Sequence, residues 1–203
     1  MASPPKTVLT ATAEEERRIR EAVRNADPRK LGPARELATA AHVDALVELL
    51  ADPAVSEPVY ALPRPITRAS VAAWIDECEA LRRKGEGLLI LNVAPGGPVM
   101  GYSKITVWPD RTSAELGGAL KASLQNAGAG GAGAAHTIGW IFEHLAVRLI
   151  CLTAALDNLR SAKLIDRMGF VRLGERDAHR PDGSLRRSLY WEMTREAWDA
   201  RKI

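Results

Sequence analysis

Four glycines fall within six residues near the middle of the chain, and this cluster is the clearest chemical signal in the sequence. The segment reads Gly128-Ala129-Gly130-Gly131-Ala132-Gly133. A backbone without bulky side chains can approach a ligand closely. An apolar stripe at helical spacing follows, so the cluster is expected to open a helix; the stripe is Ile138, Ile141, Phe142 and Leu145. Because a helix N-terminus combines unpaired N–H groups with partial positive charge, the expected chemistry is phosphate binding.

The cluster also fits G-x-G-x-x-G, the fingerprint of dinucleotide-binding oxidoreductases, and Asp157 follows Gly133 by 24 residues. Two features of the surrounding sequence argue against that interpretation. The turn of a dinucleotide site follows directly from an apolar parallel strand, whereas residues 122–127 form a polar linker. Only 46 residues follow Asp157, and they end with a hairpin pattern instead of further βαβ units. A Rossmann-type oxidoreductase is therefore a remote alternative.

The glycine cluster must be held by neighbouring strands and helices, which the hydrophobic pattern places along the chain from Gly32 onward. Helices are expected after Thr39 and Thr67, at the cluster, and from Asp157-Asn158. Strands are expected over residues 34–37, 88–93, 100–108, 114–120, 149–156, 170–173 and 189–193. Residues 95–98 and 181–183 have the composition of hairpin turns. The order predicts an α/β fold with a mixed, mostly antiparallel sheet, flanking helices and one central right-handed βαβ crossover.

The first 31 residues have a different character and are assigned to an N-terminal helical appendage or arm, ahead of a domain that spans residues 32–203. Residues 13–26 are strongly charged, with few apolar side chains, and Asp27-Pro28 ends the predicted helix. A solvated helix or a flexible arm is the expected role of this segment, and a dimer contact is the alternative.

Composition and charge narrow the class of protein. The chain has 203 residues, 46% of them apolar, which suits one domain or one domain with an appendage. A net charge of +3 is too small to indicate a nucleic-acid or membrane-surface protein. Cys78 and Cys151 cannot make a disulfide scaffold, so a reduced cytoplasmic setting fits best. No apolar run reaches the roughly 18 residues of a membrane span, and no cluster of His, Cys or carboxylate residues indicates a metal site.

Four motifs occur in order around the glycine cluster. A predicted strand carries Ala114-Glu115-Leu116-Gly117, and the segment Gln125-Asn126-Ala127-Gly128-Ala129-Gly130 starts ten residues after Glu115. Asn158-Leu159-Arg160-Ser161 and Met168-Gly169-Phe170 follow the next strand. This ordered set resembles the GNAT superfamily of acetyl-CoA-dependent N-acetyltransferases, and within it the RimJ/RimL branch that acetylates ribosomal-protein N-termini. The resemblance covers residues 32–194, is strongest from 114 to 170, and implies the GNAT (acyl-CoA N-acyltransferase) fold.

The resemblance implies that acetyl-CoA is the co-substrate and that backbone amides from Asn126 to Gly131 bind its pyrophosphate. The opened edge of the 114–120 strand, which splays away from the 149–156 strand, would bind the pantetheine arm. The coenzyme-binding residues implied in this way are Leu120, Gln125, Asn126, Ala127, Gly128, Ala129, Gly130, Gly131, Asn158 and Ser161. In one departure, many relatives carry Lys or Arg within the loop, where this chain has Asn126 and Ala127. We therefore expect either weaker coenzyme affinity or a basic residue that reaches in from elsewhere.

The acceptor amine must lose a proton to attack, because the pKa of an α-amine is about 8 and that of a lysine about 10.4. By resemblance, Glu115 is the candidate base, with a salt bridge or hydrogen bond at the sheet edge as its alternative role. Ser161 is the candidate acid for the departing thiolate. Asn158 is expected to bind the pantetheine arm, to cap a helix, or both. Ile165 lies seven residues after Asn158, where some GNAT enzymes have a tyrosine, so the tyrosine mechanism is excluded.

Together these assignments predict direct transfer of an acetyl group to a primary amine, on a protein N-terminus or a small molecule, without a metal ion or a covalent enzyme intermediate. A catalytically silent CoA-binding or regulatory domain of the same fold is the alternative, which the missing loop cation keeps open. No nucleic-acid or membrane partner is expected. Many relatives pair as dimers, so a homodimer is a further open alternative.

Overall fold

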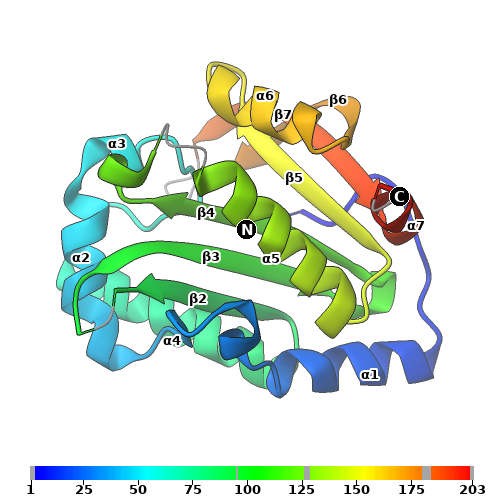
Figure 1. The fold of residues 1–203 in the computed structure, drawn as a ribbon, viewed down its shortest axis with the longest axis horizontal. Coiled ribbons are helices and arrows are strands. Elements are labelled where there is room, and N and C mark those ends of the chain that lie inside the picture. Colours follow the sequence, from blue (N-terminus) through cyan, green and yellow to red (C-terminus); the bar gives the residue numbers. More distant parts are fainter. Residues whose placement is uncertain (1–2, 95, 126–128, 180–183, 202–203) are drawn as a thin grey trace.

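A seven-stranded sheet forms the centre of the molecule, in the order β1-β2-β3-β4-β5-β7-β6 (Figure 1). The computed structural model describes residues 3–94, 96–125, 129–179 and 184–201. Neighbouring strands are antiparallel, except that β4 and β5 are parallel. The strands are β1 (Arg35–Leu37), β2 (Gly87–Val93), β3 (Val99–Trp108), β4 (Ser113–Leu120), β5 (Leu149–Ala155), β6 (Val171–His179) and β7 (Leu185–Thr194). The sheet confirms the predicted mixed α/β fold, and its antiparallel pairs rule out the Rossmann alternative.

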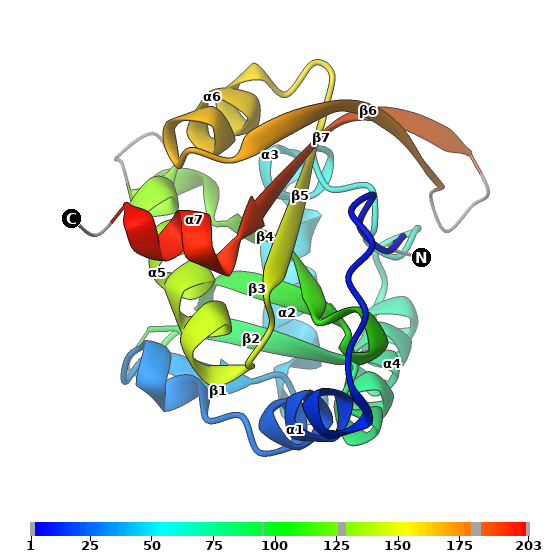
Figure 2. The ribbon, with the colours of Figure 1, turned by 90° about the vertical axis from the view of Figure 1, so that its right-hand side faces the viewer.

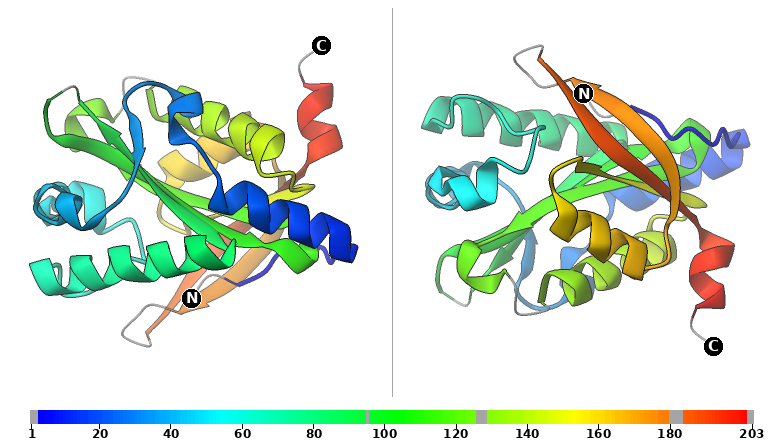
Figure 3. Two further views of the ribbon diagram at one scale, coloured as in Figure 1. Left: turned by 90° about the horizontal axis from the view of Figure 1, so that it is seen from below. Right: turned by 90° about the horizontal axis from the view of Figure 1, so that it is seen from above.

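Helices cover both faces of this sheet (Figure 3). One core lies between the sheet and α1, α5, α6 and α7, and a second core lies between the sheet and α2, α3 and α4. The alternation of side chains along a strand explains the two cores: on β2, Leu88 and Ile90 enter the first, and Leu89 and Leu91 enter the second. The helices are α1 (Ala13–Arg24), α2 (Val43–Ala51), α3 (Pro53–Ser56), α4 (Arg68–Lys84), α5 (Ala129–His144), α6 (Leu159–Arg167) and α7 (Arg195–Ala200).

Within the described ranges, no helix combines the length and the apolar character that a bilayer crossing requires.

The N-terminal helix α1 packs into the domain. Ile19 and Val23 are completely buried in the same core as α5. On the other side of the helix, Arg20 and Arg24 donate hydrogen bonds to main-chain carbonyl groups at the end of α4. The expectation of a solvated helix or flexible arm is therefore wrong for this helix, because two apolar residues one turn apart anchor an otherwise charged sequence. The division of the chain after residue 31 stays a prediction.

The last hairpin and two short helices differ from the sequence prediction. The helices α3 and α7 were not expected, and β6 and β7 extend well beyond residues 170–173 and 189–193. The added length is mostly polar, and the paired residues reach His179 opposite Leu185. Backbone hydrogen bonds hold the two strands together whatever the polarity of their side chains, so a prediction from hydrophobic periodicity underestimates the length of the strands. The predicted turn at residues 181–183 lies outside the described residues.

Two adjacent glycines in β4 give a test of how closely β3 and β4 approach. A Cβ atom added to Gly118 would lie 2.3 Å from the carbonyl oxygen of Tyr102, whereas one added to Gly117 would meet nothing within 4 Å. We expect Gly118→Ala to lower the free energy of unfolding by about 2 kcal/mol or more, because the two backbones must separate. The matched change Gly117→Ala is expected to stay within about 0.5 kcal/mol of the wild type. Urea unfolding of both variants measures this, and equal effects would contradict the close approach.

Candidate active site

The strands β4 and β5 pair over only three residues and then separate, and the gap that opens between them is called the fork below. Ser113, Ala114 and Glu115 lie opposite Leu149, Ile150 and Cys151. Beyond this point β4 continues to Leu120 along β3, and β5 continues to Ala155 along β7. Figure 1 shows the two strands diverging. From Leu116 to Leu120 the β5-facing edge of β4 therefore has no strand partner among the described residues, so its backbone groups can bind an extended ligand.

The helix α5 begins at the open end of this fork. Its first described glycine, Gly130, lies close to the end of β4, because an added Cβ would be 3.7 Å from a methyl group of Leu120. At Gly131 an added Cβ would lie 2.8 Å from Cδ1 of Leu164, so this glycine allows α5 and α6 to pack together. Ala129 starts the helix. The remaining predicted loop residues, Asn126, Ala127 and Gly128, lie outside the described residues.

Gln125 connects three elements at the mouth of the fork. Its Nε2 donates to the carbonyl oxygen of Leu120 at 2.9 Å and to that of Ala54 at 3.4 Å. Its Oε1 accepts a hydrogen bond from Nη1 of Arg160 at 2.8 Å. The sequence prediction placed Gln125 at this site but missed Arg160. No local pattern in the sequence predicts this contact, because 35 residues separate the two partners.

Asn158 caps the N-terminus of α6. Its Oδ1 accepts a hydrogen bond from the backbone N–H of Ser161 at 3.1 Å, so the predicted capping role is confirmed. Ser161 lies in the first turn of α6 and is half-buried. The positive end of this second helix lies near the beginning of α5, because Arg160 in its first turn donates to Gln125, four residues before α5 begins. The contacts of Asn158 and Ser161 with a coenzyme stay predictions.

Glu115 lies where β4 and β5 part. It is opposite Thr106 of β3 and Cys151 of β5, and only 9% of its surface is exposed. The hydroxyl of Thr153 donates a hydrogen bond to its Oε1 at 3.2 Å. Burial raises the pKa of Glu115 from its usual 4.5 to about 7, although the Thr153 hydrogen bond and the charges of Arg176 and Lys104 act in the opposite direction. The carboxyl group therefore changes its protonation state near neutral pH.

Tyr60, in the connection between α3 and α4, lies over the same region. It is half-buried, and its hydroxyl interacts with Thr153. Burial and the nearby charge of Glu115 raise the pKa of Tyr60 to about 12. Its phenol consequently stays neutral at physiological pH and can act as a hydrogen-bond donor beside the candidate base.

The N-terminal residues form another part of this surface, on the side of β7. Figure 2 shows the segment before α1 rising from that helix on the side of the sheet opposite α5. The backbone N–H of Lys6 donates to the hydroxyl of Tyr190 at 3.1 Å, and that of Thr7 donates to Oε1 of Glu192 at 3.0 Å. Arg176 of β6 donates to the carbonyl groups of Ser3 and Pro4, and its guanidinium lies 4.3 Å above the ring of Tyr190. This segment is thus a wall of the polar face that carries Glu115.

Among the residues that the structure describes, no group of three or more His, Cys, Asp or Glu side chains could hold a metal ion. The two ends of the gap between β4 and β5 differ in chemistry. The first turn of α6 and the start of α5 lie at its open end, and the buried acid Glu115, with a pKa of about 7, lies where the strands part.

The raised pKa of Glu115 has a consequence for stability. A carboxyl group whose pKa is higher in the folded state stabilises the fold below pH 4.5, and that contribution is lost as the pH rises through about 7. Glu115→Gln removes this titration. Relative to the wild type, we therefore expect the variant to gain about 3 kcal/mol in free energy of unfolding between pH 4.5 and pH 8. Urea unfolding across this range measures the difference. Glu57→Gln, at an exposed position beyond α3, serves as the control, and a pH-independent difference for Glu115→Gln would contradict the assignment.

Comparisons with known proteins show which family the chain resembles. The family model described as "Acetyltransferase (GNAT) domain" matches residues 35–171. A ribosomal-protein alanine acetyltransferase from Vibrio fischeri is 15% identical, with a TM-score of 0.68 over 81% of this chain and 93% of that chain. RimJ from Mycobacterium smegmatis, in complex with CoA-disulfide, is 20% identical, with a TM-score of 0.67 over 80% and 81% of the two chains.

An aminoglycoside acetyltransferase in complex with coenzyme A is 22% identical, with a TM-score of 0.67 over 84% of this chain and 99% of that chain. A comparison with curated proteins gives no match. At these identities the solved structures establish the fold, while the family model covers about two thirds of the sequence. The chain belongs to the GNAT family of acetyltransferases.

Proposed function

We propose that this protein transfers the acetyl group of acetyl-CoA directly to a primary amine, and that Glu115 is the base. The observation that carries the proposal is the position of Glu115: a buried acid with a pKa of about 7 lies where β4 and β5 separate. The acceptor is an amine of a protein N-terminus or of a small molecule. The solved relatives include acetyltransferases for a ribosomal protein and for aminoglycosides, which are examples of these two classes.

The residues present fit acetyl-CoA. The open edge of β4 offers backbone N–H and C=O groups to the pantetheine arm, in the way that a neighbouring strand would. The N-terminus of α5 faces the pyrophosphate. An N–H group from residues 119–122 would polarise the thioester oxygen and stabilise the negative charge that develops there. Bound in this position, the thioester lies beside the strand that carries Glu115.

The pKa values indicate which groups accept and donate protons during the reaction. Above pH 7 the carboxylate of Glu115 accepts the proton of the attacking amine, directly or through a water molecule. The thiol of coenzyme A has a pKa of about 8.5, so the thiolate leaves readily and an acid contributes little. Ser161, in the first turn of α6, is the proposed donor of a proton to the departing thiolate. A silent CoA-binding domain of the same fold is the alternative that a turnover assay separates from this mechanism.

The use of acetyl-CoA can be tested through stability. A ligand that binds the native state alone raises the melting temperature, and at 100 times its dissociation constant it adds about 2.7 kcal/mol. We expect millimolar acetyl-CoA to raise the melting temperature by several degrees, and NADH at the same concentration to leave it unchanged. Thermal unfolding followed by fluorescence measures both. No shift with acetyl-CoA would refute the proposed co-substrate, and a shift without coenzyme A release on any of a panel of amines would favour the silent domain.

The role of Glu115 can be tested through pH dependence. We expect kcat/KM to rise with pH through about 7 as the base loses its proton. Thr153→Val removes the hydrogen bond that lowers the pKa of Glu115, so this limb should move to higher pH while the enzyme stays active. Glu115→Gln should lower kcat about 100-fold or more and abolish the limb. An unchanged limb in Glu115→Gln would assign the titration to another group.

A further inference from the structure

The face of the sheet that carries Glu115 is the face that the acceptor amine must approach, because the proposed base has to reach the amine. Two residues further along β4, on the same face, lies Gly117. Gly117 is exposed, and a Cβ atom added to it would meet nothing within 4 Å. Open space therefore lies beside the candidate base, in the direction in which the fork opens.

Lys104 of β3 borders this space. It lies opposite Gly117, and Thr106 lies opposite Glu115. Since paired residues share a face of the sheet, Lys104 and Glu115 are diagonal neighbours on that face, a separation that a long side chain can bridge. Burial raises the pKa of Glu115, and the positive charge of Lys104 is one of the effects that oppose this rise. The two side chains are thus close enough to act on one molecule.

The half-buried side chain of Lys104 has no counter-charge in the part of the chain that the structure describes. None of the hydrogen bonds and ion pairs there involves its ammonium group. Burial raises the pKa of the nearby Cys78 thiol to about 11, although Lys104 acts in the opposite direction, so this thiol is neutral at physiological pH. Glu77, the acid beside Cys78, is exposed. Because an ammonium group that loses water without gaining a partner is costly, a negatively charged ligand group would stabilise it.

The other charged groups of this face are already engaged. The guanidinium of Arg176 donates to two carbonyl groups of the N-terminal segment and lies above the ring of Tyr190. The carboxylate of Glu192 accepts from the hydroxyl of Tyr190 and from a backbone N–H of the same segment. Along the described lengths of β3, β4, β5 and β7, this face therefore offers a cationic acceptor no carboxylate besides Glu115, and it offers an anionic group the ammonium of Lys104.

We propose that the acceptor carries a carboxylate close to its amine, and that Lys104 binds this carboxylate while Glu115 receives the proton of the amine. A free amino acid and a protein N-terminus with an acidic first side chain share this chemistry. A lysine suits the role, because its flexible stem carries three donors and a compact charge. The inference rests on the proposed acetyl transfer and narrows the class of amine.

The test uses pairs of acceptors that differ by one charge. Alanine is compared with alaninamide, and a peptide amide that begins with aspartate is compared with one that begins with asparagine. Spermidine represents the cationic amines. Steady-state release of coenzyme A gives kcat/KM for each acceptor.

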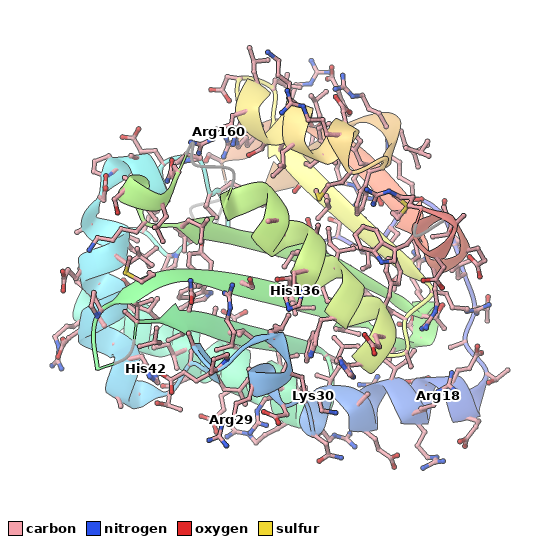
Figure 4. All side chains as sticks on the ribbon, viewed as in Figure 1. Arg18, Arg29, Lys30, His42, His136 and Arg160 are labelled. Carbon is pink, nitrogen blue, oxygen red and sulfur yellow. The ribbon has the colours of Figure 1, made fainter. Side chains whose placement is uncertain are left out.

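Two variants change the proposed carboxylate-binding group. Lys104→Met keeps an apolar stem and removes the charge, and Lys104→Arg keeps the charge. The matched control is Lys30→Met, at an exposed lysine between α1 and α5 (Figure 4). Those two helices cover the other face of the sheet.

We expect the wild type to prefer the carboxylate member of at least one pair about tenfold or more in kcat/KM. The pair that shows the preference distinguishes a free amino acid from an acidic N-terminus. Lys104→Met should bring this ratio close to one, Lys104→Arg should keep most of it, and Lys30→Met should leave it unchanged. Because both members of a pair depend on Glu115, a change in the pKa of Glu115 alters their rates together and leaves the ratio the same.

Three outcomes would overturn the inference: a wild-type ratio near one for both pairs, a preference of the wild type for spermidine, or a ratio that survives in Lys104→Met. The melting temperature of each variant shows whether its fold is intact, and the wild-type ratios need no variant. Absence of coenzyme A release with every amine would refute the proposed function instead, so the two failures are distinguishable.

Discussion

The separation of β4 from β5 is the constraint on which the rest of the site depends. Two parallel strands in the middle of a sheet normally pair along their length, because unpaired backbone groups are costly to bury. Here the pairing stops after Glu115, and each strand is held by its other neighbour, β4 by β3 and β5 by β7. On one side of the gap β3 packs closely against β4 at Gly118, and on the other side β7 pairs with both β5 and β6.

The same separation divides the chemistry of the site. On one side, the ends of β4, α5 and α6 come together with Gln125 and Arg160 and offer donors and positive charge. At the base of the gap, Glu115 is surrounded by β-strands and is hydrogen-bonded to a neutral hydroxyl. Burial without a close cation raises the pKa of a carboxyl group, whereas a salt bridge would lower it. The environment of Glu115 therefore suits a proton acceptor better than a structural ion pair.

Much of this arrangement could be predicted from the sequence, because its signals are local. The strand with Glu115, the helix after the glycine cluster and the cap at Asn158 are each encoded within a few residues. The features that were missed depend on contacts across the fold. The burial of Ile19 and Val23 requires the core under α5, and the position of Arg160 requires α5 and α6 to meet at Gly131. The charged sequence of α1 contains only two large apolar residues, one turn apart, and no local pattern links Arg160 to Gln125, 35 residues before it.

The position of the N-terminal segment depends mainly on contacts of its main chain. Its contacts with the body of the protein are made largely by its main chain, through the carbonyl groups of Ser3, Pro4, Pro5 and Thr10 and the N–H groups of Lys6 and Thr7. These main-chain contacts do not depend on which side chains the segment carries, but they do depend on the number of residues between them. Apart from the buried Pro5 and from Lys6, whose Nζ donates to the carbonyl groups of Leu173 and Glu175, the residues of this strip can be exchanged without loss of these contacts. The insertion or deletion of a single residue, by contrast, would shift the contacts on one side of it together and rearrange the wall beside Glu115.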